Sequence, residues 1–224
     1  MASQTTTGRV NQKLRTRAAI VQAAAELSRT GRELAMPEIA RAALVSEATA
    51  YRYFPDLAGL LREAIAGQLP TPDEALAAVA DSADPVERVA AATEFLLRHV
   101  LARQGVVRAM IASTITRPGD AAARPGLRFG LIEHALAPLD AAPGRADGTG
   151  PAALAQLKLD LAVVVSAEAL FSLTDLYGLE PEAAVASVVH TASTLTRAAL
   201  RKSSAHNGRV GPAPLGAGPT DSGV

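Results

Sequence analysis

The sequence predicts an all-α protein, and three observations carry that prediction. Aromatic residues make up 3% of the 224 residues while alanine is abundant, a composition that favours helices over sheets. Apolar residues recur at spacings of three and four, and no strand-like alternation persists. Glycine and proline interrupt this pattern where helices would end. Apolar residues are 49% and charged residues 20% of the chain, enough for a packed core and unlike a disordered chain.

The first elements are expected to be a flexible basic arm over 1–13 and three helices. The first helix follows the polar arm and ends near Gly31, because glycine readily takes the left-handed conformation that ends helices. A second, short helix runs over about 36–43. A third begins after Ser46, a favourable N-cap, and ends near Tyr53, just before a proline.

The rest of the chain is a helical pattern interrupted by turns. A fourth helix starts near Asp56 and ends by Pro70. Further helices are expected near 72–82, 85–103, 105–115, 125–139, 152–177 and 181–202. Residues 140–151 are typical of a flexible loop, and the tail 203–224, rich in Gly, Pro and Ser, is expected to be disordered. These boundaries predict a three-helix domain over 14–56 and a larger helical domain over 57–202.

Charge and composition restrict the function classes. The 22 basic and 22 acidic residues cancel, but the segment through Arg62 carries a net +4 and the remainder a net −4. A basic N-terminal part suggests that only this part contacts a polyanion. The absence of cysteine excludes disulfides, thiolate metal sites and cysteine nucleophiles. The longest apolar run, Leu161 to Val165, is far too short to span a bilayer, and no signal peptide is visible, so a cytoplasmic protein without membrane contact is expected.

Residues 36–54 have the layout of a helix-turn-helix. Ile39 and Ala40 on the first short helix would face Ala50 and Phe54 on the second, across a turn of about three residues. Small side chains at the crossing let the two helices approach closely. In a helix-turn-helix the second helix lies in the DNA major groove. An ordinary helical hairpin within a bundle would explain the same periodicity.

The order of residues within this segment distinguishes the two readings. The residues that carry a recognisable motif are Ile39, Ala40, Ala43, Val45, Ser46, Thr49, Tyr51, Tyr53 and Phe54. In this pattern the segment resembles the N-terminal DNA-binding domain of the TetR (tetracycline-repressor-like) family of bacterial transcription regulators. The resemblance covers about 45 residues. It implies a homodimeric repressor that binds double-stranded DNA at a palindromic operator and is released by a small-molecule effector.

The segment departs from the family pattern at three positions. Leu44 stands where the family has a turn glycine, so a side chain occupies a position that is usually left-handed, at a cost of about 1 kcal/mol or a rearranged turn. Ala35 replaces a capping threonine, and Leu57 replaces a lysine that contacts phosphate. Together these changes would lower DNA affinity.

The resemblance also indicates which residues contact DNA. The expected DNA-contacting residues are Glu47, Ala48, Thr49, Tyr51, Arg52 and Tyr53 on the second helix, and Lys13, Arg15 and Arg17 before or within the first. Arg52 can contact guanine through two hydrogen bonds, and Ala48 or the methyl group of Thr49 can contact a thymine methyl. The tyrosine hydroxyls suit phosphate oxygens, although core packing would explain Tyr51 equally well.

The larger domain is expected to supply a dimer interface and a ligand site. Helix 152–177 is apolar on two sides and would need cover on both. The expected interface, a four-helix arrangement of the kind the family uses, consists of Leu154, Leu157, Leu161, Val185, Val188, Ala192 and Leu195. The candidate ligand-binding residues are Phe95, His99, Met110, Thr114, Phe129, His134, Glu168, Phe171 and Asp175. Glu168 and Asp175 could instead form ion pairs with Arg98, Arg103 or Arg108.

Two other function classes stay open on the residues alone. An all-α enzyme is the weaker one, because no nucleophile-elbow, zinc-protease, P-loop or dinucleotide motif occurs and the four histidines are scattered. Accordingly no catalytic residue, metal site or cofactor is expected. The other is a small-molecule-binding or protein-interaction module whose DNA-binding part has been weakened by the three departures.

Overall fold

A computed structural model describes residues 3–66, 68–116, 126–140 and 150–207, and every regular element in these ranges is a helix. The four N-terminal helices are α1 (Ser3–Ser28), α2 (Met36–Ala42), α3 (Glu47–Tyr53) and α4 (Leu57–Ala66). They are followed by α5 (Pro72–Ala75), the 3-10 turn η1 (Ala77–Val79), α6 (Pro85–Ala102), α7 (Gln104–Thr116), α8 (Leu127–Asp140), α9 (Pro151–Val164), α10 (Ala167–Phe171), the π-helical turn η3 (Ser172–Leu176) and α11 (Pro181–Asn207). The all-α prediction is confirmed.

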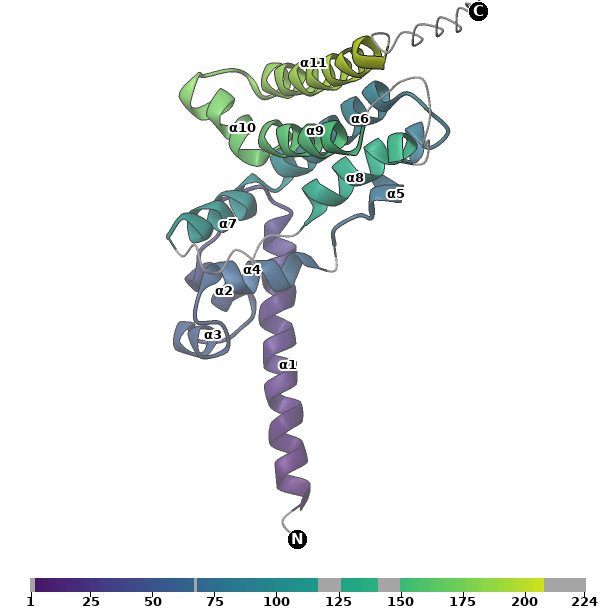
Figure 1. The fold of residues 1–224 in the computed structure, drawn as a ribbon. Coiled ribbons are helices and arrows are strands. Elements are labelled where there is room, and N and C mark those ends of the chain that lie inside the picture. Colours follow the sequence, from purple (N-terminus) through teal and green to yellow (C-terminus); the bar gives the residue numbers. More distant parts are fainter. Residues whose placement is uncertain (1–2, 67, 117–125, 141–149, 208–224) are drawn as a thin grey trace, which may run out of the picture.

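The helices form two packed groups, which we call the head and the body (Figure 1). The head consists of α1 to α4, and its core contains Ile20, Ile39, Phe54, Leu60 and Leu61, all buried. The body consists of α5 to α11, with α6 packed against both α8 and α11. Helix α7 belongs to both groups, because its side chains of residues 106 and 110 are part of the head core.

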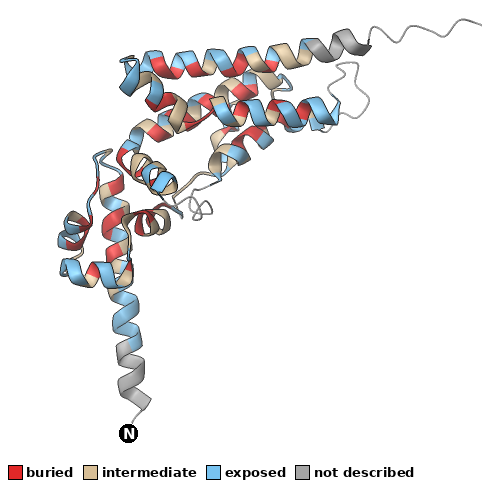
Figure 2. Cartoon of the chain, turned by 60° about the vertical axis from the view of Figure 1, so that its left-hand side comes forward, coloured by how far each residue is buried: buried red, intermediate tan, exposed pale blue. Residues whose placement is uncertain are grey.

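Helix α1 is longer than the sequence predicts. Residues 3–13, expected to be part of a flexible arm, continue the helix, which extends well beyond the rest of the head (Figures 1 and 2). Val10 and Leu14 are exposed, so this part of α1 is not held by packing. Once the packed half has formed, each further residue adds one hydrogen bond without a new nucleation cost, which lets the helix propagate outward.

The predicted helix over 152–177 is broken in the structure. Val165 leaves helical geometry (ψ 72°) and Ser166 is extended, and the Ser166 hydroxyl accepts a hydrogen bond from the backbone N–H of Ala169 at 3.1 Å. Serine therefore acts as the N-cap of α10 instead of continuing α9, as serine side chains often do. Of the predicted flexible segments, 141–149 and 208–224 lie outside the described residues, whereas 203–207 continue α11.

The predicted dimer interface lies largely inside a single chain. Six of its seven residues are buried in the body core, namely Leu154, Leu157, Leu161, Val185, Val188 and Ala192. Leu195 is half-buried. These side chains are unavailable to a partner, because α9 and α11 pack against each other within the chain and use their most apolar faces to do so. The sequence correctly marked these faces as buried but assigned them the wrong partner.

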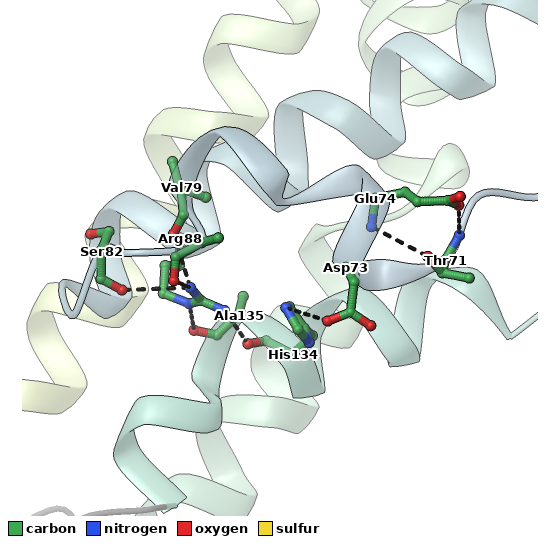
Figure 3. A network of polar contacts seen from close by, with 9 residues as sticks. Thr71, Asp73, Glu74, Val79, Ser82, Arg88, His134 and Ala135 are labelled. Atoms are coloured by element: carbon green, nitrogen blue, oxygen red, sulfur yellow. Dashed lines mark hydrogen bonds and ion pairs between the residues drawn. The ribbon is translucent and has the colours of Figure 1, made fainter.

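The buried Arg88 on α6 connects three parts of the body (Figure 3). Its guanidinium donates hydrogen bonds to the backbone carbonyls of Val79, Ala80 and Ser82 on one side, and to those of His134 and Ala135 on the other. Pro138 lies within α8 and has no N–H to bond the carbonyl four residues before it, which is that of His134. Arg88 therefore satisfies a carbonyl that the proline leaves unpaired.

Candidate functional site

The turn between α2 and α3 has the geometry of a Schellman motif. The N–H of Val45 donates to the carbonyl of Ala40 at 3.0 Å, and the N–H of Leu44 donates to that of Arg41 at 3.1 Å. Leu44 has a φ of +56° and a side chain that is 93% exposed. The turn thus keeps the left-handed geometry usual for glycine, with a leucine in it, and does not rearrange.

The beginning of α3 is fixed by its cap. The Ser46 hydroxyl accepts the backbone N–H of Thr49 at 3.2 Å and lies 2.9 Å from the Thr49 hydroxyl. The hydroxyl of Thr49 is therefore engaged within the helix, and its methyl group is the part left for an outside contact. Ala50 of α3 is fully buried, and its burial fixes which face of the helix is exposed.

The exposed face of α3 carries four of the predicted DNA-contacting residues. Glu47, Ala48, Tyr51 and Arg52 are all exposed. Tyr53 is half-buried, packs against the head core, and lies with its ring centroid 5.8 Å from the Arg52 guanidinium. The Tyr51 side chain belongs to the surface, so of the two readings left open for it, core packing is wrong.

The basic residues of α1 separate into two groups. Lys13 and Arg15 are exposed on α1. Arg17 instead forms a two-pronged ion pair with Glu63 of α4, with 2.6 Å between Nη2 and Oε2, and its guanidinium lies 4.8 Å from the centroid of the Phe54 ring. Arg17 thus links α1 to α4, and this pairing competes with any phosphate contact.

The two other departures from the family pattern have structural counterparts. Ala35 is the N-cap of α2, with extended geometry and no side-chain hydrogen bond to the helix. Leu57 begins α4 and packs, half-buried, against the head core. The position expected to hold a phosphate-binding lysine is therefore occupied by an apolar packing residue.

A cavity of about 490 Å³ lies between the head and the body. Residues from α4, α6, α7, α8 and α10 line it, and most of them are apolar. Five of the predicted ligand-binding residues are among the lining, namely His99, Met110, Thr114, Phe129 and Glu168. The volume is in the range of small-molecule sites in proteins. Ile65, Val106 and Met110 belong both to the cavity wall and to the head core.

The four other predicted ligand-binding residues lie elsewhere. Phe171 and Asp175 line a neighbouring hollow of about 360 Å³. Phe95 stacks on the ring of His99 with centroids 6.2 Å apart. His134 lies away from the cavity, with Nε2 3.6 Å from a carboxylate oxygen of Asp73 (Figure 3), so its assignment to this cavity is wrong.

Asp175 is held in an ion pair with Arg108, one of the alternatives that the sequence left open. Arg108 donates to both carboxylate oxygens, one at 2.8 Å, and its guanidinium lies 3.9 Å from the centroid of the Phe171 ring. These hydrogen bonds hold the pKa of Asp175 below its usual value. The pair ties α7 to the π-helical turn η3.

The polar part of the cavity wall centres on His99. Burial and, secondarily, the charge of Arg103 lower the pKa of His99 to about 4, so its ring is neutral at physiological pH. Arg103 Nη1 lies 3.3 Å from His99 Nδ1, which must accept this hydrogen bond. The proton of the neutral ring is then on Nε2, a buried atom with no hydrogen-bond partner.

Sequence reasoning missed several residues of the cavity wall. Arg103 and Arg128 were not expected there, nor were Ile65 and Val106 from the head side. Arg103 follows His99 by four residues on a predicted helix, a spacing that places two side chains on one face and could have indicated the pair. No comparable signal exists for Ile65, because its contact depends on how the head packs against α7. Within the described ranges, no group of three or more metal-ligating side chains comes together.

Comparison with known proteins identifies the head. Residues 19–64 match the family described as bacterial regulatory proteins, tetR family. This segment of the chain is therefore similar to the DNA-binding part of tetR-family regulators. The match spans α1 from its packed half through α4, which is the part of the structure that contains the helix-turn-helix. The similarity to transcription regulators thus lies in the head.

The other comparisons add less. Among solved structures, the chain is similar to a TetR transcriptional regulator from Rhodococcus sp. RHA1, with 22% sequence identity and a TM-score of 0.49. That alignment covers 82% of this chain and 97% of the other. No curated protein matches the sequence. In the described part of the chain, no helix is both long and apolar enough to cross a membrane.

Proposed function

We propose that this protein is a homodimeric repressor that binds a palindromic operator through α3 and is released by a small-molecule ligand. The observation that carries the proposal is the exposed face of α3. Ser46 caps this helix, and the buried side chain of Ala50 fixes its orientation on the head. Such a helix fits the major groove. A role of this kind places the protein in the cytoplasm with the DNA.

Each exposed residue of α3 has a role that follows from its chemistry. Arg52 would donate two hydrogen bonds to O6 and N7 of a guanine, and Ala48 would contact a thymine methyl. Glu47 could accept from cytosine N4. Tyr51 would donate to a phosphate oxygen, and Lys13 and Arg15 on α1 would add contacts to the DNA backbone. The phosphate contacts position the protein and the base contacts select the sequence.

The cavity supports the ligand part of the proposal. Because Ile65, Val106 and Met110 are shared between the cavity wall and the head core, a ligand that displaces them would also shift α4 and α7. In a dimer such a shift changes the spacing of the two α3 helices. The ligand would then favour a dimer geometry that no longer fits the operator, which is a shift between two populations.

Selection of bound duplexes from a random DNA pool tests the DNA-binding function. The purified full chain at moderate salt should enrich an inverted repeat, and its affinity should fall steeply as salt rises. Lack of any enriched sequence would contradict the proposal and favour a module whose head no longer binds DNA.

The variant Arg52→Ala tests the proposed base contact. We expect it to lose about 1–3 kcal/mol of discrimination at one base pair of each half-site. Tyr51→Phe is the matched comparison, because loss of a phosphate contact should weaken binding to all sequences alike. An unchanged sequence preference in Arg52→Ala would refute the assignment of Arg52 as a base reader.

A further inference from the structure

His99, a residue of the cavity wall, carries an unpaired hydrogen-bonding atom. His99 Nε2 is buried and has no partner, while the other ring nitrogen accepts from Arg103. Buried polar atoms are nearly always paired, so an exception in a cavity points to a group that binds there. Because the neutral ring carries its proton on Nε2, that group must be an acceptor.

The charges around the donor indicate what kind of acceptor fits. Arg103 is on the wall beside His99, and no carboxylate of the described residues pairs with it. Arg128 and Glu168 are also on the wall, with Arg128 Nη1 3.8 Å from Glu168 Oε2. Among the described lining residues, Arg103 and Arg128 are positively charged and Glu168 is negatively charged, so one positive charge is in excess. This excess favours an anionic acceptor, since charge-assisted hydrogen bonds are the stronger ones.

The remaining wall indicates the rest of the ligand. The lining away from these groups is apolar, including Leu96, Val107, Ile111 and Leu127. The hydroxyl of Thr114 donates to carbonyl oxygens of its own helix, at 2.8 and 3.2 Å, and so adds little polarity. A ligand with an extended hydrocarbon body would bury that body against these apolar residues.

From these observations we propose that the cavity binds an organic monocarboxylate with an apolar body. Its carboxylate accepts from the Nε2–H of His99, while Arg103, on the opposite edge of the ring, fixes this tautomer and supplies positive charge. This inference rests on the proposed function, in which the cavity is the effector site. It goes further by naming the class of effector and the two side chains that select it.

Calorimetric titration of the full chain with three probes tests the inference. Decanoate, decanol and decylammonium share one hydrocarbon chain and differ in head-group charge, and each is used below its micelle-forming concentration. We expect decanoate to bind at least about tenfold more tightly than decanol, with decylammonium the weakest. Equal or tighter binding of decanol or decylammonium would overturn the inference, as would the absence of binding by all three.

Variants locate the binding site of the carboxylate. Arg103→Met should weaken decanoate binding about tenfold or more and leave decanol binding unchanged. Arg98→Met is the matched control, because Arg98 is on α6, which Arg103 caps, but pairs with Glu94 and Glu182 outside the cavity. If Arg103→Met binds decanoate as the wild type does, the inference fails.

A spectroscopic measurement covers the case in which Arg103→Met does not fold. In protein labelled with ¹⁵N-histidine, decanoate should shift the Nε2 resonance of His99 and leave that of His190, on α11, unchanged. No shift at His99 at saturating decanoate would overturn the inference. Binding that requires Arg103 but does not alter operator affinity would support the inference and contradict only the ligand-release part of the proposed function.

Discussion

Leu44 shows how a single residue can depart from a family pattern without changing the backbone. Its left-handed conformation and the two hydrogen bonds of the turn are those that a glycine would have. A left-handed residue with a Cβ costs about 1–2 kcal/mol, and Leu44 recovers little of this by packing because its side chain is exposed. The head therefore retains the geometry of the motif at a cost in stability.

The variant Leu44→Gly should accordingly stabilise the protein. We expect a gain of about 0.5–1 kcal/mol, since relief of strain is partly offset by the greater flexibility of glycine in the unfolded chain. For a chain of this size that gain raises the melting temperature by roughly 1–4 °C. Ala42→Gly, an exposed position in α2, is the control and should lower it. A melting temperature of Leu44→Gly at or below the wild-type value would contradict this account.

At the scale of elements, α7 and the loop after α1 approach each other closely. Gly105 is the second residue of α7, and a Cβ placed on it would lie 1.9 Å from the carbonyl oxygen of Arg32. From the other side, a Cβ on Gly31 would lie 3.5 Å from the carbonyl oxygen of Ala102. Only a glycine at position 105 allows this approach of two backbone segments.

The variant Gly105→Ala tests this contact. Neither backbone can yield as a flexible side chain would, so α7 must move away from the loop, and we expect a loss of about 1–3 kcal/mol. Gly59→Ala in α4 is the matched control, because its Cβ would meet only ordinary contacts, the nearest at 3.4 Å from an Asp56 carboxylate oxygen. Denaturant unfolding measures both, and equal stability of Gly105→Ala and the wild type would contradict the proposed close packing.

At the scale of the whole molecule, the proposed dimer needs a surface other than the predicted one. Leu159 and Val163, one turn apart on α9, are 63% and 75% exposed. The exposed face of α11 carries mostly small residues, among them Ala183, Ala186 and Ser187. Apolar side chains of this kind on one helix, beside a helix with a small-residue face, fit a second copy of the chain better than solvent.

Light scattering on the double variant Leu159→Glu, Val163→Glu tests this surface. The wild type should be a dimer at micromolar concentration, and the variant a monomer, because burying two carboxylates from each subunit would raise the dissociation constant about a hundredfold or more. Leu176→Glu, at an exposed apolar position on η3, should remain dimeric. A wild type that is monomeric at these concentrations would refute the dimer.

The sequence alone determined much of the head and the course of most helices. The bounds of α3 and its serine cap follow from residues close together in the chain, which is why they could be predicted, whereas the turn at Leu44 was left open between a left-handed and a rearranged form. The break after Val165 was missed because a serine within an apolar pattern is compatible both with a continuing helix and with a cap. Local sequence does not decide between these two states.

Only the tertiary structure decided which faces meet. The pattern of α9 and α11 shows that Leu157 and Val188 are buried, but it does not say whether by the same chain or by a partner. The same holds for Arg17, which the sequence predicts to contact DNA and which pairs with Glu63 in the structure. It also holds for Nε2 of His99, a buried atom without a hydrogen-bond partner. Periodicity specifies which side of a helix is apolar, whereas the partner on that side depends on contacts between residues far apart in the chain.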